Sequence, residues 1–248
     1  MDIIWKDMKF FLTCLTHLSV SQSMALGNNG GFCVSTNCAS ENWIYYPEPI
    51  TDSNTVDIAV KFFADRNISF MWPVYSGGSE FLGDSGLIYA GDLAAMTLDP
   101  AKITPGIDDN ITFEHIVTPE QSQEWARTAW HGFGGGTDDT PENYFALVNS
   151  LNGERENFSL YLARMGGASV GTFMITQEPD IMGVYYFAVI PEMRRKGIAV
   201  MMMNEVCRLS GGKRIVLQAT PSGRPFYKNY GFEELFMIPV YSTEKDIF

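Results

Sequence analysis

Three consecutive cations lie between an apolar stretch and a methionine-rich one. Residues 189–203 read VIPEMRRKGIAVMMM, so Arg194, Arg195 and Lys196 come directly before Gly197. A helix starting at this glycine would present unpaired backbone N–H groups and the positive end of its dipole. Phosphate or diphosphate is the anion best matched to such a site, and the arginines would add charge-assisted hydrogen bonds. The alternative interpretation is a solvated basic turn.

The elements around this turn predict an α/β domain. An apolar strand is expected over 181–190, a helix over 194–211 and a strand over 213–220. A strand without polar alternation is typical of one buried on both faces. The second half therefore predicts the order β-α-α-β-β-β-α-β-α-β. Its other elements are a strand at 111–117, helices with Thr-Pro-Glu starts at 118–133 and 140–152, two strands within 158–177, a short helix at 223–231 and a strand at 232–242.

The first half predicts a second α/β lobe. The polar, proline-bearing segment 99–110 is expected to separate a lobe of residues 1–105 from a domain of residues 111–248. DSGLIYAGDLAAMTLD in the first half resembles NYGFEELFMIPVYS in the second, which either duplication or chance explains. The expected elements of this lobe are a helix at 2–20, a glycine-rich loop leading into strand material at 27–35, a strand at 41–49, a helix at 55–67, a strand at 68–75, a short helix at 81–86 and a strand at 87–99.

The composition indicates a folded protein and argues against nucleic-acid binding. Of 248 residues, 46% are hydrophobic and 19% charged, which is enough to bury a core. With 17 basic against 29 acidic residues, the chain lacks the positive footprint of a nucleic-acid binder. An acidic surface is compatible with a cationic amine partner, although solubility alone also explains it.

The four cysteines and the N-terminal apolar run predict a cytoplasmic protein without a membrane segment. The cysteines match no CxxC metal pattern and are too few for a disulfide scaffold, so no metal and a reducing compartment are expected. The run FFLTCLTHLSV at 10–20 is too short to span a bilayer. Asp2 and Asp7 also remove the positive region that a signal peptide needs, so a core helix is predicted there.

The basic turn fits a known signature. RRKGIA at 194–199 matches [Gln/Arg]-x-x-Gly-x-[Gly/Ala] at every defined position, and FYKNYGF at 226–232 contains a Tyr-x-x-x-Gly-Phe element. With the strand before the turn and the helix and strand after it, residues 111–248 resemble the GNAT superfamily of N-acetyltransferases. The resemblance implies a mixed, mostly antiparallel sheet flanked by helices. Together with the internal echo, it implies two lobes in a tandem GNAT-like arrangement.

The resemblance also implies acetyl-CoA as the co-substrate, lying in a V-shaped split between the fourth and fifth strands of the domain. The backbone of the signature turn would hold the pyrophosphate, and the preceding strand end would pair with the pantetheine amides. A backbone N–H near Val189 would polarise the thioester carbonyl. Thr220 would either touch the cofactor or cap a helix. The implied cofactor-binding residues are Phe187, Ala188, Val189, Arg194, Arg195, Lys196, Gly197, Ile198, Ala199 and Thr220.

Tyr227 matches the family tyrosine that serves the departing thiolate, so the resemblance implies that it is the general acid. The alternative is a tyrosine packed on its helix with the hydroxyl in water. The general base stays unassigned, because the strand IMGVYYFAVI carries no acid. Tyr185, Tyr186 or a water chain are the replacements, ahead of Glu178, Glu192, His115 and His131.

These observations favour an acetyl-CoA-dependent N-acetyltransferase acting on a primary amine of a small molecule or an amino terminus. One alternative is a non-catalytic acyl-CoA-binding or sensing protein, and another is a transferase with a longer acyl donor. A homodimer is compatible with the resemblance. The first lobe lacks a basic glycine turn, so it is expected to hold no pyrophosphate and to cover the acceptor pocket or offer a partner surface. Its aromatic residues are expected in the core, or alternatively along a cleft: Trp43, Tyr45, Tyr46, Phe70 and Trp72.

Overall fold

The computed structural model describes residues 3–104, 106, 110–135 and 139–244. In the first half, the predicted helices and the three predicted strands are confirmed, most of them shorter than expected, and the strand material near residue 31 is confirmed as β2. The strand β1 was missed, because it is an edge strand of mostly exposed residues without apolar alternation. The elements are α1 (Ile3–Leu15), β1 (Gln22–Leu26), β2 (Gly31–Ser35), β3 (Trp43–Tyr45), α2 (Ser53–Ala64), β4 (Met71–Pro73), α3 (Ser79–Asp84) and β5 (Ile88–Leu98).

The second half has the predicted order of elements. Thr118 caps its first helix with a capping box that includes Gln121, and Thr140 caps the second through the Asn143 backbone N–H, as the two Thr-Pro-Glu starts predict. The elements are β6 (Ile111–His115), α4 (Pro119–Gly132), α5 (Pro141–Gly153), β7 (Phe158–Met165), β8 (Ala168–Thr176), β9 (Ile181–Val189), α6 (Ile198–Leu209), β10 (Arg214–Ala219), α7 (Arg224–Tyr230) and β11 (Glu233–Ser242).

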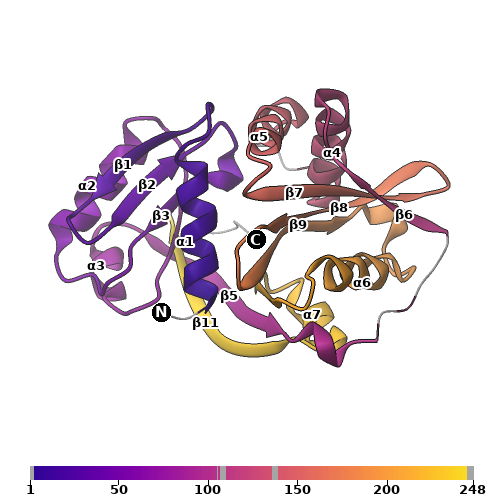
Figure 1. Cartoon of the computed structure of the whole chain (residues 1–248). Coiled ribbons are helices and arrows are strands. Elements are labelled where there is room, and N and C mark those ends of the chain that lie inside the picture. Colours follow the sequence, from indigo (N-terminus) through magenta and orange to yellow (C-terminus); the bar gives the residue numbers. More distant parts are fainter. Residues whose placement is uncertain (1–2, 105, 107–109, 136–138, 245–248) are drawn as a thin grey trace.

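The described strands form one eleven-stranded sheet that runs through both halves (Figure 1). Its order is β1-β2-β3-β4-β11-β5-β10-β9-β8-β7-β6. The β3–β4 and β9–β10 pairs are parallel, and the other described pairs are antiparallel. Helices cover the sheet, with α4 and α5 on one face of the second half and α6 on the other (Figure 1). The mixed, mostly antiparallel fold expected from the sequence is therefore confirmed.

The two halves exchange their last strands at the centre of the sheet. β5 lies between β10 and β11, and β11 lies between β5 and β4. Both halves share the order strand-helix-strand-helix-strand, as β3-α2-β4-α3-β5 and as β9-α6-β10-α7-β11. The sequence echo falls on equivalent elements of this arrangement, α3–β5 and α7–β11. The predicted boundary at 99–110 follows β5, and residues 105 and 107–109 of it lie outside the described residues. Whether 1–105 and 111–248 act as separate domains stays a prediction.

The strands β9 and β10 separate along their length. They pair only through Ile181–Gly183 against Arg214–Val216, and their remaining residues are not paired with one another. β9 continues beyond this point as a partner of β8, and β10 as a partner of β5. Parallel strands that diverge in this way leave the backbone edges of both strands open toward the space between them. This is the V-shaped split that the resemblance implies.

Two apolar clusters hold the walls of the split in place. On one face, residues of α1, α4 and α5 pack together with β7, and on the other face α6 packs on β8, β9 and β10. Met202 and Met203 are fully buried in the second cluster, so two methionines of the run 201–203 fill the core. Helix α1 contacts both β9 and β10, so an element of the first half closes one side of the split.

Two further properties concern the described residues as a whole. None of their helices combines the length and apolar character needed to cross a membrane. Nor do they contain a group of three or more His, Cys, Asp or Glu side chains that could hold a metal ion.

Candidate functional site

A cavity of about 900 Å³ passes through the split between β9 and β10. Its outer part is lined by Arg194 and Ala199 at the start of α6, by Thr220 after β10 and by Tyr227 on α7. Its inner part reaches the first half of the chain, where the loop before β3 and the helix α1 form the wall. One continuous space therefore joins the signature turn to the contact between the two halves.

A β-bulge in β9 shapes the middle of this cavity. Thr172 pairs with Ala188 and Met174 with Tyr185, so β9 has one residue more than β8 over this stretch. The bulge includes Tyr186, which has a positive φ of 49°. Both Tyr185 and Tyr186 consequently pack toward α1, α4 and α5, although successive residues of a regular strand point to opposite faces.

The end of β9 turns free backbone groups toward the split. The Ile190 N–H donates to the Val170 carbonyl at 3.0 Å, and Gly171 is the register partner of Val189. Because N–H groups alternate sides along a strand, the N–H of Val189 points away from β8 and into the split. Phe187, Ala188 and Val189 all line the cavity, as the resemblance implies for the residues that would pair with pantetheine.

The signature turn leaves the start of α6 without a side-chain cap. Gly197 is the N-cap residue with a φ of 80°, and Arg195 has a φ of 62°. Ile198 is buried and anchors the first turn in the core, whereas Arg195, Lys196 and Gly197 are exposed. The first N–H groups of the helix are thus free to bind an anion.

The three cations of the turn differ in what they contact. The Arg194 guanidinium donates to the carbonyl oxygens of Val189 at 3.1 Å and of Gly132 at 2.7 Å. Arg194 therefore ties the turn to β9 and to the end of α4. The Lys196 ammonium lies 3.4 Å from the sulfur of Met193 and remains exposed, as does Arg195. Long-range attraction of an anion thus falls mainly to Arg195 and Lys196.

Thr220 and Tyr227 lie on the opposite wall. The Thr220 hydroxyl accepts from the Gly223 N–H at 3.3 Å and lies 3.1 Å from the Ser222 hydroxyl, so it caps the turn before α7 while lining the cavity. Tyr227 is buried between the rings of Phe187 and Phe232. Burial raises the pKa of Tyr227 far above its ordinary value, so its hydroxyl stays protonated at neutral pH.

The other acid and base candidates lie outside this cavity. Glu192 is exposed and accepts from His131, with 2.9 Å between carboxylate and Nε2. His115 packs against the ring of Tyr161, and Glu178 is buried beside Lys6. None of these four side chains lines the cavity among the residues that the structure describes. Tyr185 and Tyr186 do line it.

Glu41 was not predicted as a site residue from the sequence. It lies in a single 3₁₀ turn of the first half, is almost fully buried and lines the inner part of the cavity. Its neighbour Trp43 lines the cavity too. Tyr45, Tyr46 and Trp72 are core residues as expected, and Phe70 is both buried and part of the lining. In the sequence, Glu41 is only an acid beside a run of aromatic residues. Such a pattern does not by itself distinguish a functional site from a surface turn.

A second buried acid closes the narrow end of the split. Asp7 of α1 is fully buried, and it accepts from the Tyr185 hydroxyl at 2.7 Å and from the Thr176 hydroxyl at 3.0 Å. A side chain on Gly183 would collide with this carboxylate, so only glycine fits there. Burial raises the pKa of Asp7 from 3.8 to about 7, although the two hydroxyls lower it. Asp7 thus fixes Tyr185 from the side away from the cavity.

We expect Asp7 to make the protein less stable at higher pH. Since its pKa is raised on folding, the protonated form is favoured in the folded state, and stability falls as the pH rises from about 4 through about 7. Between pH 5 and pH 8 this amounts to a loss of about 2.5 kcal/mol in the free energy of unfolding. Asp7→Asn removes that loss, which urea titrations at both pH values measure.

Asp180→Asn is the control for this prediction, because the side chain of Asp180 is exposed. Glu41, whose pKa is also raised to about 7, contributes a decline of the same sign and similar size in both variants, so the effect of Asp7 is the difference between them. An equal decline with pH in wild type and Asp7→Asn would contradict the prediction.

Comparison with known proteins agrees with this geometry. Residues 156–234 match the family model described as the acetyltransferase (GNAT) domain. No curated protein matches the chain by sequence. Among solved structures, a GCN5-related N-acetyltransferase from Kribbella flavida has 15% identity and a TM-score of 0.69, with 98% of this chain and 96% of that chain covered.

Two further solved structures are similar over both halves. A GCN5-related N-acetyltransferase from Sphaerobacter thermophilus has 15% identity and a TM-score of 0.61, covering 86% of this chain and 76% of that one. A tandem GNAT protein from the clavulanic acid biosynthesis pathway has 10% identity and a TM-score of 0.60, covering 96% and 94%. The GNAT resemblance and the two-lobed, tandem GNAT-like fold are therefore confirmed. The match to the acetyltransferase family model supports an acyltransferase, and the GNAT fold implies acetyl-CoA as its co-substrate.

Proposed function

We propose that this GNAT-fold protein transfers the acetyl group of acetyl-CoA to a primary amine by direct attack on the thioester. The observation that carries the proposal is the continuous cavity, which joins an uncapped helix start and an open strand edge to a buried chamber at the first half. A nucleotide-bound thioester needs the first two features. A second substrate needs access to the thioester from the far side, which the chamber provides.

The residues present fit acetyl-CoA. The free N–H groups at the start of α6, with exposed Arg195 and Lys196 beside them, suit the pyrophosphate. The unpaired edge of β9 suits the amides of pantetheine, because it offers backbone donors and acceptors like a sheet edge. In this arrangement the Val189 N–H is the donor nearest to the end of the strand, where it would hydrogen-bond the thioester carbonyl.

Each reacting group then has a defined role. Attack of the amine nitrogen on the carbonyl carbon forms the amide bond as the carbon–sulfur bond breaks. The Val189 N–H stabilises the negative charge on the carbonyl oxygen during attack. Tyr227, protonated and in the cavity wall, donates its proton to the departing sulfur.

Thiol release tests the proposal. With acetyl-CoA, we expect β-phenethylamine to raise thiol release well above the hydrolytic background, and 2-phenylethanol, its match in shape, to leave it unchanged. Propionyl-CoA and butyryl-CoA in the same assay report the acyl chain that the cavity accepts. Tight binding of acetyl-CoA in calorimetry with no thiol release from a broad panel of amines would favour the acyl-CoA sensor instead.

A further inference from the structure

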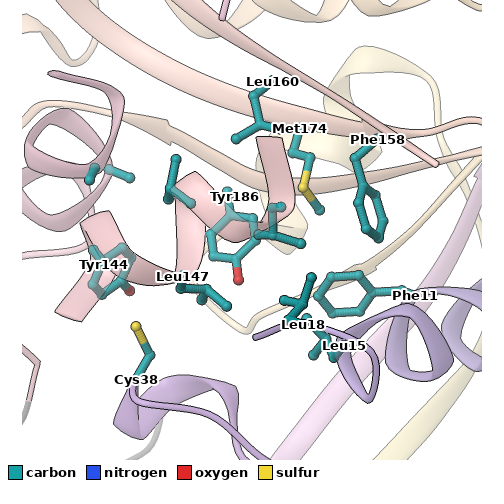
Figure 2. Close-up of a cluster of buried hydrophobic side chains, with 14 of the residues drawn as sticks. Phe11, Leu15, Leu18, Cys38, Tyr144, Leu147, Phe158, Leu160, Met174 and Tyr186 are labelled. Carbon is teal, nitrogen blue, oxygen red and sulfur yellow. The ribbon is translucent and has the colours of Figure 1, made fainter. Parts of the chain in front are cut away.

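The inner end of the cavity is built jointly by the two halves of the chain. From the second half come Tyr144 of α5 and Tyr186 of β9, and from the first half comes the turn Ala39–Glu41. Figure 2 shows Tyr186 with Tyr144 and Leu147 to one side, its hydroxyl oxygen turned away from the strands and toward the segment that carries Cys38. We call this region the inner chamber. It is distinct from the signature turn and from the open edge of β9.

The inner chamber carries negative charge without a cation to balance it. Glu41 and Asp139 both line it, and neither forms an ion pair with a described residue. Among the described residues that line the whole cavity, Arg194 is the cationic one, and its guanidinium is bound to two backbone carbonyls at the outer end. A carboxylate taken out of water without a partner is costly, so a cationic ligand is favoured here.

The two acids are not equivalent. Asp139 accepts from the backbone N–H groups of Ala39 at 2.6 Å and Ser40 at 3.1 Å, and from the Ser40 hydroxyl at 2.9 Å. Asp139 therefore holds the turn that presents Glu41. The Glu41 carboxylate accepts from the Trp43 indole N–H at 2.9 Å, which uses one of its oxygens. Glu41 is thus the acid with capacity for a ligand.

The Tyr186 hydroxyl is a second sign of a missing ligand. Tyr186 is 8% exposed, and its buried hydroxyl faces the Glu41 carboxylate but makes no hydrogen bond of ordinary length with a described residue. A buried hydroxyl without a partner costs about 1–3 kcal/mol. The bulge that carries Tyr186 at a positive φ turns this side chain toward the same chamber as Glu41. Its oxygen can accept a hydrogen bond from an N–H donor.

The remaining walls are aromatic. Trp43, Trp130 and Phe133 line the cavity, and the ring of Phe133 lies 6.5 Å from that of Tyr186. Aromatic faces attract cations and pack well against the apolar part of an amine. A substrate carboxylate, in contrast, would meet Glu41 and find no free cation in the lining that the structure describes.

We propose that the inner chamber binds the acceptor as a primary ammonium ion with an apolar body and no carboxylate, and that Glu41 is the counter-ion that takes its proton. This inference rests on the proposed acetyl transfer and adds the class of acceptor and the base. Tyr186 accepts a hydrogen bond from the ammonium and fixes its position. The base thus comes from the first half of the chain, which explains why β9 carries no acid.

The protons balance along this route. One proton passes from the ammonium to the Glu41 carboxylate, which leaves a neutral amine. The amine attacks the thioester, and its nitrogen then loses a second proton while Tyr227 gives its own proton to the sulfur. The second proton restores Tyr227, and Glu41 releases the first to solvent. One ammonium and one thioester therefore yield one amide, one thiol and one proton.

Binding of β-phenethylamine tests the chamber independently of turnover. In calorimetry with the full chain, we expect wild type to bind β-phenethylamine at least tenfold more tightly than L-phenylalanine, which differs by a carboxylate. Glu41→Gln should weaken the binding of β-phenethylamine about tenfold. Glu178→Gln is the control, because Glu178 is also buried but lies outside the cavity, and it should leave this affinity unchanged. Equal affinity for the two ligands would overturn the proposal.

The pH dependence of acetylation tests the role of Glu41 as base. The titratable groups that face Glu41 are Asp139, Cys38, Tyr144 and Tyr186, and burial raises the pKa of Glu41 itself to about 7. We expect kcat/KM for β-phenethylamine to rise through about pH 7 in wild type and in Glu178→Gln. In Glu41→Gln it should be lowered at least tenfold and lose that rise.

The outcomes separate the two proposals. One outcome is that no acetyl-CoA turnover and no amine acetylation is seen, but β-phenethylamine binds in a Glu41-dependent way. The inner chamber is then an ammonium-binding site, and the proposed reaction is refuted. If amines are acetylated while Glu41→Gln behaves like Glu178→Gln in both binding and pH profile, the reaction stands and the role of Glu41 is refuted.

Discussion

Gly197→Val is expected to weaken the binding of acetyl-CoA by about 100-fold or more. Gly197 has a φ of 80°, in the left-handed region where a β-branched residue is strained. Relieving that strain rotates the peptides at the start of α6, whose N–H groups are the anion donors. Hydrogen bonds to a charged group contribute about 1.5–3 kcal/mol each, so losing two of them accounts for the expected change. Isothermal calorimetry with acetyl-CoA measures it.

Gly212→Val is the matched control for this substitution. Gly212 lies just beyond the other end of α6, is exposed, has a φ of 90° and, like Gly197, has open space where a side chain would stand. The two variants thus carry similar backbone strain, and we expect similar melting temperatures for both. Only Gly197→Val should lose acetyl-CoA. If Gly197→Val kept the affinity of wild type for acetyl-CoA, the signature turn would not be the pyrophosphate site. The proposed function would then lose its basis.

The turn was predictable from the sequence because its features are local. A glycine that permits a positive φ, the cations before it and the apolar residue after it all lie within six residues, and the buried Ile198 confirms the anchoring of the helix. The elements of the second half were predictable for the same reason, since threonine caps and apolar periodicity act within one or two turns. Local rules place these elements in order, and most of their ends fall within a few residues of those expected.

The contacts of the Arg194 side chain could not be predicted from the signature motif. The sequence places three cations side by side, but in the fold it is the Arg194 guanidinium that reaches the Val189 and Gly132 carbonyls. Gly132 is distant in the sequence, at the end of α4, so no local pattern reports this contact. A motif position can therefore be occupied by a residue whose side chain organises the site without reaching the ligand.

The exchange of strands and the position of Glu41 depend on contacts between the halves. β5 and β11 have ordinary strand patterns, and nothing in them shows that each lies among strands of the other half. Glu41 becomes a cavity residue only because Asp139, about a hundred residues later, binds the turn that carries it. Long-range hydrogen bonds of this kind cannot be deduced from a single sequence.

The first half also shows why it is expected to hold no pyrophosphate of its own. Its helix α2 occupies the place that α6 has in the second half, between the two parallel strands. The Asp52 carboxylate caps α2, accepting from the Thr55 N–H at 2.9 Å and from the Thr55 hydroxyl at 3.0 Å. The Asp52 carboxylate thus already places a negative charge at this helix start, and it would repel a pyrophosphate. The first half instead contributes α1 and the inner chamber to the site.

Tyr227→Phe is expected to lower kcat about 100-fold and to leave the affinity for acetyl-CoA nearly unchanged. The ring is held by its aromatic neighbours Phe187 and Phe232, so phenylalanine keeps the packing and removes only the hydroxyl. General acids contribute about 100-fold to 10,000-fold, and a thiolate is a good leaving group, so the lower end is expected. Because the pKa of Tyr227 is strongly raised, its proton is present at every pH of the assay. Thiol release and calorimetry measure the two quantities.

Tyr230→Phe separates this effect from a general loss of helix α7. Tyr230 lies one turn further along the same helix and donates to the Asn204 side chain at 2.7 Å, outside the described lining of the cavity. Its loss should cost about 1 kcal/mol of stability and leave kcat unchanged. If Tyr227→Phe retains full kcat while Tyr230→Phe does the same, the departing sulfur takes its proton from water. Tyr227 would then serve only to pack the cavity wall.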